Sequence, residues 1–345
     1  MNWAKKIVFV ITICIFIYIL WRLISRQVPR LDKGFSEGFS FTPTPDSDLI
    51  SMKNADSVKI LNIDHSVMNL PIIEYAIKGS YNSGCTGYFI NKDAITYVLS
   101  RGCRYIDLEV SLVDGVPSLV QPNDPSLNTL SLNDALTTIS INAFNSSTSP
   151  NFKDPLFLNL RIDASDPKIY PLVAKSVESN MTTRLYKKKI TNKTKLSEVA
   201  GSVVLLVDRT IDLNWKKKAA CNQAKQTTKC YDLTTYMNME SGSDDLLMYY
   251  TSDMLDQYPV PVYVKNDNVH TNVEKMYLIN PHSDSNANIA DYELYQLMMK
   301  HGCQIIPFCF YMNDANLAYY ESVFNDNKCA FVPMHALVTY YKDKV

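Results

Sequence analysis

The sequence predicts an α/β fold with a parallel sheet, and a single TIM-type (β/α)8 barrel fits best. Its 345 residues, 46% of them hydrophobic, are enough to bury a sizeable core. From about Val58 to the C-terminus, short apolar runs alternate with helix-like segments, which is the pattern of strand-helix-strand units. No internal repeat is visible, and the range 58–345 has the length of one barrel.

The elements of this barrel follow one another along the chain. Asn91 and Gly102 bound one helix, because asparagine caps helix N-termini and glycine ends helices. Residues 216–245 are polar and irregular, so we expect an insertion there. The expected strands cover residues 73–78, 105–110, 118–120, 156–162, 202–207, 276–279 and 305–310, and the expected helices cover 92–101, 131–142, 169–179, 289–300 and 314–324.

The N-terminal residues 1–30 predict a membrane anchor, with a transmembrane helix at about residues 7–24. No charge interrupts Ile7 to Trp21, and basic residues flank the run on both sides. A cleaved signal peptide is the alternative, but no small-x-small site follows the run. Basic residues are denser on the C-terminal side, which favours a single-pass membrane protein with a cytosolic or virion-interior barrel. The polar residues 31–57 then form a linker.

Charge and cysteine content exclude other classes. The formal net charge of −1, with acids and bases interspersed, argues against nucleic acid as the main partner. The eight cysteines show no CxxC spacing, so no zinc site is predicted. Cys221 and Cys230, in a polar stretch, are the one plausible local disulfide.

The expected strand at residues 105–110 carries two acidic residues at alternate positions. Residues i and i+2 of a strand share a face, so Asp107 and Glu109 point the same way. Two adjacent carboxylates repel each other unless a cation, a metal or protonation offsets them. The sequence therefore predicts a charged or metal-binding group between Asp107 and Glu109.

Two pairs of segments resemble one enzyme family. Residues 77–83 (Ile-Lys-Gly-Ser-Tyr-Asn-Ser) and 102–109 (Gly-Cys-Arg-Tyr-Ile-Asp-Leu-Glu) resemble the X half of eukaryotic phosphoinositide-specific phospholipase C. That family has Ser-His-Asn-Thr at a strand end, then Gly-Cys-Arg, an apolar pair and Glu-Leu-Asp. Residues 281–285 and 302–308 are similar to its Y half. The resemblance implies a phospholipase-C-like barrel that uses two catalytic histidines and one calcium ion, held by an asparagine and three acidic residues.

The resemblance places unsuitable residues at both histidine positions. Tyr81 stands at the first position and Gln121 near the second. A phenol with a pKa of about 10 is a poor general base at neutral pH, and glutamine cannot exchange a proton. Asp208 falls among the family's phosphate-binding lysines and would repel a polyphosphorylated headgroup.

The calcium ligands implied by the resemblance are only partly kept. Asn82, Asp107 and Glu109 occupy three of the positions, and Arg161 occupies the fourth. Two arrangements stay open. Arg161 can pair with both carboxylates in place of the ion, or it can tilt away while Asp163, on the same strand face, supplies the missing oxygen.

The favoured hypothesis is a membrane-anchored, phospholipase-C-like pseudoenzyme that acts as a binding or structural module at a viral or organellar membrane. It needs no cofactor, and its ligand is either a phospholipid headgroup or a protein. One alternative is an active metal-dependent phosphoric diester hydrolase with altered catalytic residues, which would use calcium. The other is a protein-binding barrel of receptor or cell-entering type, with residues 216–245 as the contact surface.

Overall fold

The computed structural model describes residues 44–53, 56–121, 128–163, 165–221, 229–282 and 287–344. The chain divides into two units, Met1–Thr44 and Pro45–Val345, and the description below concerns the second. The expected transmembrane helix at residues 7–24 lies outside the described residues. Among the described helices, none has the length and apolar character needed to cross a membrane. On this finding, the prediction of a single-pass membrane protein with a cytosolic or virion-interior barrel is withdrawn.

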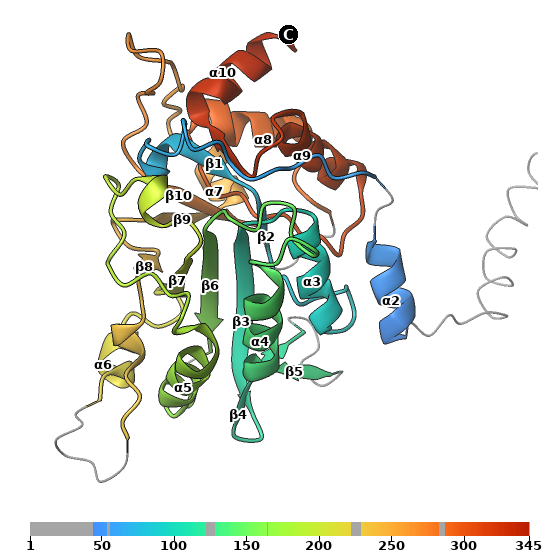
Figure 1. Ribbon diagram of the computed structural model, residues 1–345, viewed down its shortest axis with the longest axis vertical. Coiled ribbons are helices and arrows are strands. Elements are labelled where there is room, and N and C mark those ends of the chain that lie inside the picture. Colours follow the sequence, from blue (N-terminus) through green and yellow to red (C-terminus); the bar gives the residue numbers. More distant parts are fainter. Residues whose placement is uncertain are drawn as a thin grey trace, which may run out of the picture. The chain divides into compact units, whose positions relative to one another are not determined.

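A parallel sheet forms the centre of the fold (Figure 1). The strands β2 (Gly79–Ser80), β3 (Tyr105–Val113), β6 (Leu156–Ile162), β7 (Val203–Asp208) and β8 (Met239–Ser241) pair in this order, all in parallel. The second half of β3 also pairs with β4 (Val116–Val120) in a hairpin, and β4 pairs with β5 (Thr129–Ser131). The predicted α/β fold is thereby confirmed.

Two further strand pairs lie beside this sheet. β1 (Tyr75–Ile77) pairs with β11 (Phe331–Pro333) in antiparallel fashion, and β9 (Leu247–Tyr250) pairs with β10 (Tyr277–Asn280) in parallel. Parallel bridges join Ile305 to Ile77 and Leu278, and Phe308 to Ser80. The expected strand at residues 305–310 is thus present only as isolated bridges. Among the described residues no ladder joins β8 to β9, so the predicted closed barrel is not established.

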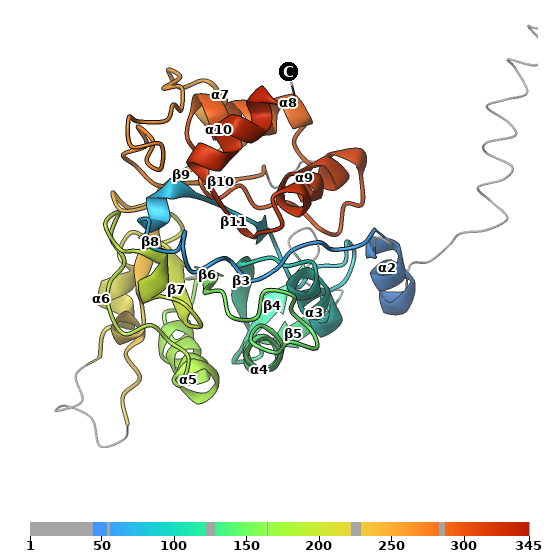
Figure 2. The same ribbon diagram turned by 45° about the horizontal axis from the view of Figure 1, so that its top comes forward.

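Helices on the outer side cover the central sheet (Figure 2). Asn91 accepts a hydrogen bond from the Asp93 amide and starts the helix after β2, as predicted. Gly102 ends that helix with a φ of +82°, and a Cβ there would lie 2.8 Å from Ile60 Cδ1, so a larger residue does not fit. The larger helices are α3 (Lys92–Ser100), α4 (Leu132–Asn142), α5 (Ile169–Met181), α9 (Ala315–Asp326) and α10 (Met334–Lys342).

Shorter helical segments connect these elements. Residues 291–300, within an expected helix, form an α-turn followed by a π-helical segment. The shorter segments are α2 (Pro45–Met52), η1 (Ile72–Glu74), η2 (Leu196–Glu198), α6 (Trp215–Ala219), η4 (Leu233–Thr235), α7 (Thr251–Leu255), α8 (Asp291–Tyr295) and η5 (Gln296–Lys300).

Two predicted domain features need correction. The expected linker at 31–57 contains the helix α2, whose Asp48 side chain is buried. The expected insertion at 216–245 includes β8, which pairs with β7, so its last part belongs to the sheet. The structure also joins Cys221 and Cys230 in a disulfide.

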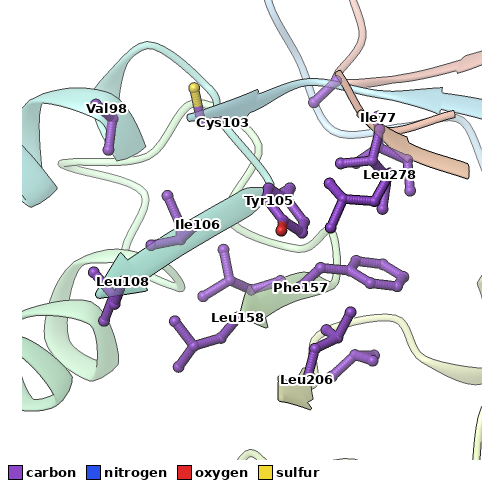
Figure 3. Close-up of a cluster of buried hydrophobic side chains, with 14 of the residues drawn as sticks. Ile77, Val98, Cys103, Tyr105, Ile106, Leu108, Phe157, Leu158, Leu206 and Leu278 are labelled. Carbon is purple, nitrogen blue, oxygen red and sulfur yellow. The ribbon is translucent and has the colours of Figure 1, made fainter. Parts of the chain in front are cut away.

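The sheet has apolar side chains on both faces near the start of its strands. Figure 3 shows Tyr105, Phe157 and Leu278 together on one side of β3, while Ile106 and Leu108 lie on the side of Val98. All of these side chains are buried. Strand alternation places Asp107 and Asn159, two residues further along, on the same face as Tyr105 and Phe157. Polar residues thus follow the apolar layer toward the carboxyl ends of the strands.

Candidate functional site

The turn after β2 is fixed to β3 by backbone hydrogen bonds. Asn82 has a φ of +45°, a left-handed conformation that asparagine tolerates better than most residues. Its amide donates to Asp107 Oδ2 at 3.1 Å. The Ser83 amide donates to the Asp107 carbonyl at 2.9 Å, and Ser83 Oγ accepts from the Asp107 amide at 3.1 Å. This turn therefore places Tyr81 and Asn82 directly beside the Asp107 carboxylate.

Arg161 occupies the space between the three remaining predicted calcium ligands. Its Nε lies 3.0 Å from Asp107 Oδ2, and a terminal nitrogen lies 2.9 Å from Glu109 Oε2. Its other terminal nitrogen donates to Asn82 Oδ1. The β3–β6 register explains the arrangement, because it sets Arg161 directly opposite Glu109 and two residues beyond Asn159, the partner of Asp107. Of the two arrangements left open by the sequence, the structure has the internal salt bridge.

The carboxylate of Asp107 is buried in this ion pair, and Arg161 keeps its positive charge beside it. Asp107 is 0% exposed and also accepts from Asn159 Nδ2 at 2.9 Å. Burial acts to lower the pKa of Arg161, but Asp107, Tyr81 and Glu109 outweigh it, so the pKa is raised and the guanidinium stays charged. The guanidinium carbon lies 4.5 Å from the centre of the Tyr81 ring, a cation-π contact.

Tyr81 cannot easily lose its proton in this setting. Burial raises the pKa of its phenol, and the nearby Arg161 only partly opposes this, so the pKa remains above its usual range. A group that holds its proton this firmly cannot serve as a general base at neutral pH.

The other predicted site residues have ordinary structural roles. Gln121 follows β4, is buried, and donates from Nε2 to the Gly87 carbonyl at 3.0 Å. Asp163 is exposed, and its Oδ1 accepts from the Ser165 amide at 3.0 Å. The role of Asp163 as a substitute metal ligand stays a prediction. Within the described ranges, no group of three His, Cys, Asp or Glu side chains is arranged to hold a metal ion.

Sequence reasoning missed two polar partners in the same layer. Asn159 bridges Asp107 and Ser241, whose Oγ donates to Asn159 Oδ1 at 3.2 Å. Its position two residues before Arg161 was a usable signal, because both share a strand face. Asp208 ends β7, and burial raises its pKa despite hydrogen bonds from Thr210 at 2.7 and 2.8 Å.

A very small cavity lies beside three of these residues. The cavity lined by Asn82, Asp107 and Glu109 has a volume of about 10 Å³. Cys85, Ile90 and Leu119 fill its other side. A single water needs roughly 10–15 Å³, so the cavity holds one water at most.

Comparison with known proteins supports the resemblance in the first part of the chain. Residues 68–205 match the family model of the phosphatidylinositol-specific phospholipase C X domain. No curated protein sequence matches the chain.

Solved structures support the fold of a larger part of the chain. PLC21 of L. pealei is similar with a TM-score of 0.56 and 16% identity over 77% of this chain and 37% of that chain. PLC21 of S. officinalis gives a TM-score of 0.54 and 15% identity over 84% and 39%. A calcium-dependent phosphoinositol-specific phospholipase C from Pseudomonas sp matches more weakly, with a TM-score of 0.34 and 14% identity over 54% and 80%. The chain thus spans about two fifths of each PLC21 structure, and at these identities the likeness concerns the fold.

Proposed function

Because residues 68–205 belong to the phosphatidylinositol-specific phospholipase C X-domain family, we propose that this chain is a phospholipase-C-like pseudoenzyme. It keeps the family fold and acts as a binding or structural module without hydrolysing phosphodiesters. The strand order β9, β10, residues 305–308, β2, β3, β6, β7 and β8 supports a barrel-like arrangement of its sheets.

The position of Arg161 carries this proposal. Calcium is bound by six to eight oxygen ligands, and here a guanidinium contacts the oxygens of Asn82, Asp107 and Glu109. A second cation in the same space would be repelled by the first and would find the carboxylates already paired. The residues present therefore do not fit a calcium ion, and no catalytic step is assigned to one.

The groups that move protons in the family have no equivalents here. Tyr81 keeps its proton, and the Gln121 amide is bound to the Gly87 carbonyl. Each general acid or base contributes roughly 10²–10⁴-fold to rate, so the loss of both leaves little catalysis.

The alternative of an active calcium-dependent phosphodiesterase needs a free metal shell and a group with a titratable proton. Arg161 already occupies the metal shell, and Tyr81 keeps its proton at neutral pH, so both observations speak against this alternative. The alternative of a protein-binding module is compatible with the pseudoenzyme proposal, because protein binding needs neither a metal shell nor a titratable proton.

Hydrolysis of phosphatidylinositol vesicles tests the proposal. With the purified full chain and calcium in millimolar excess, we expect inositol phosphate release at the rate of the protein-free control. Titration calorimetry should show no calcium binding in the same buffer. Release that depends on calcium and disappears in a Glu109→Gln variant would overturn the proposal, whereas release unchanged by Glu109→Gln identifies a contaminating enzyme and leaves the proposal standing.

A further inference from the structure

A second feature of the chain lies at the opposite end of the strands from the candidate site. Residues 184–195 contain six basic residues, and no acidic residue occurs between Glu178 and Glu198. Leu185 bridges to Val203, the first residue of β7, whereas Asp208 at the other end of β7 belongs to the polar layer. This basic segment is therefore independent of Arg161 and its partners.

The basic segment forms one wall of a groove with a volume of about 290 Å³. Asn238 joins the two walls, because its Nδ2 donates to the carbonyls of Tyr186 and Lys188 at 2.8 Å each. The Ile190 amide donates to the Asn238 carbonyl at 3.0 Å. The groove is lined by Leu185, Tyr186, Lys187, Lys188, Lys189, Thr234, Thr235, Tyr236, Met237 and Asn238.

The positive charge of the lysines in the basic segment, residues 184–195, has no carboxylate partner in the described residues. Five of the six basic residues are exposed lysines, and none of the five forms an ion pair with a carboxylate in the described part of the chain: Lys187, Lys188, Lys189, Lys193 and Lys195. Burial lowers the pKa of Lys189, and the nearby Lys216 lowers it further against the opposing effect of Glu240. A bound anion would relieve this repulsion.

We propose that this groove binds an extended acidic peptide segment of a partner protein. The lysines are spread along a segment, whereas a compact phosphate needs donors that converge on one point. A peptide can match spaced positive charges with spaced carboxylates, and its backbone amides can donate to the hydroxyl oxygens of Thr234 and Thr235 on the opposite wall.

Two other anionic partners fit the groove less well. No well-exposed large hydrophobic side chain of the described residues lies in residues 184–195 or in the groove, so a membrane would gain no apolar anchor there. Glu178 accepts from Tyr236 Oη at 2.9 Å at the edge of the groove, and burial together with the nearby Glu198 raises the pKa of Tyr186. These carboxylates repel a nucleic acid, which is charged at every phosphate, whereas a peptide can place neutral residues beside them.

Binding of a fluorescein-labelled alternating Glu-Ser peptide to the full chain tests this inference. We expect anisotropy to rise with protein concentration and the affinity to fall with added salt. The groove triple variant Lys187→Glu, Lys188→Glu and Lys189→Glu should weaken binding by at least about tenfold, because each exposed charge contributes up to about 1 kcal/mol and is here reversed. The matched triple Lys92→Glu, Lys168→Glu and Lys265→Glu changes net charge equally at exposed positions outside the groove, and we expect a change within about twofold.

Three results would overturn the inference. The first is no measurable peptide binding, and the second is equal weakening by the two triple variants, which would mean that only net charge matters. The third is tighter binding to phosphatidylserine vesicles or to single-stranded RNA than to the peptide, with loss in the groove triple, because the partner would then be a membrane or a nucleic acid. Circular dichroism of both triples shows that they are folded. None of these measurements depends on hydrolysis, so the proposed function can fail without this inference failing.

Discussion

A single side chain decides the chemistry of the candidate site. Asp107 and Glu109 would suit a divalent cation by their position on one strand face, but Arg161 supplies a permanent positive charge from the neighbouring strand. An arginine cannot be lost to solvent as a metal ion can, so the buried carboxylates keep a partner under all conditions. A permanent contact from Arg161 thus takes the place of a metal ion that could dissociate.

Replacing this arginine should expose the remaining calcium ligands. In Arg161→Gln, the buried Asp107 loses its charged partner and faces Glu109, so we expect the free energy of unfolding to fall by about 3–5 kcal/mol. Calcium should recover part of the loss, because the variant offers several oxygen ligands and calcium tolerates irregular geometry. Urea unfolding with and without calcium measures both effects.

The exposed Arg209 provides the control for this experiment. Arg209→Gln should change stability by less than about 0.5 kcal/mol and give no calcium response. If Arg161→Gln is as stable as the wild type, the ion pair with Asp107 and Glu109 does not stabilise the fold.

The contact of Arg161 with Asp107 and Glu109 was predictable from the sequence. Strand alternation puts the two carboxylates on one face, and the family pattern puts Arg161 beside them. Sequence reasoning did not reach Asn159, which matched no family position, and it placed Asp208 at a phosphate-binding position without predicting that Asp208 lies close to Asp107 and Arg161. It also could not give the size of the cavity. That size depends on how Cys85, Ile90 and Leu119 pack from separate elements, which no local pattern encodes.

At the scale of elements, a short helix outside the sheet holds the loop next to the candidate site. Asp48 in α2 is buried, and its Oδ2 accepts from Thr86 Oγ1 at 2.6 Å and from the Tyr88 amide at 2.9 Å. The same loop presents the Gly87 carbonyl to Gln121. The loop following the Tyr81–Asn82 turn is thus fixed from two sides.

Removing the Asp48 contact should loosen this loop. In Asp48→Ala, the buried Thr86 hydroxyl and the Tyr88 amide lose their acceptor, so we expect a stability loss of about 1–3 kcal/mol. Hydrogen exchange of the Tyr88 amide should become faster.

Asp46→Ala is the matched control for Asp48→Ala. Both residues lie in the first turn of α2 and share its helix-dipole effect, but Asp46 is exposed. Equal effects of the two variants on Tyr88 exchange would mean that α2 helicity, rather than the Asp48 contact, holds the loop.

Most strands and larger helices were predictable because each carries its own signal. β6 and β7 are rich in leucine and valine, and α3 and α4 begin at Asn91 and Ser131 caps. α2 was missed because its sequence is polar and its position depends on Asp48 bonding to a distant loop. β8 was missed because three residues, Met239–Ser241, give no periodic pattern and become a strand only by pairing with β7.

At the scale of the whole molecule, buried charges join the first and last parts of the fold. Lys78 Nζ, 0% exposed, lies 3.0 Å from Glu321 Oε1, and Arg101 donates to both carboxylate oxygens of Glu321 at 2.7 and 2.9 Å. Lys78 also donates to the Arg101 carbonyl at 2.7 Å. Helix α9 is in this way tied to the β1–β2 segment and to the end of α3, elements more than 200 residues apart.

The stability of this connection should depend on pH. Burial alone would raise the pKa of Glu321, but Lys78 and Arg101 outweigh it, so the folded-state pKa lies below its usual value. A carboxyl whose pKa is depressed by folding stabilises the protein above its unfolded pKa, and this contribution is lost as pH falls through the folded pKa.

Glu321→Gln tests this linkage. At pH 7 the variant leaves two buried cations without a counter-charge, so we expect it to unfold with about 3–5 kcal/mol less free energy than the wild type. Below the usual range of glutamate, at about pH 4 and lower, the carboxyl of the unfolded chain takes up a proton, so the difference should begin to shrink, and it should disappear once pH falls below the depressed folded-state pKa. Urea unfolding of both proteins between pH 7 and pH 3 measures the difference. A difference that stays constant across this range would show that Glu321 acts through its shape and hydrogen bonds, and that its charge does not hold α9 to the rest of the fold.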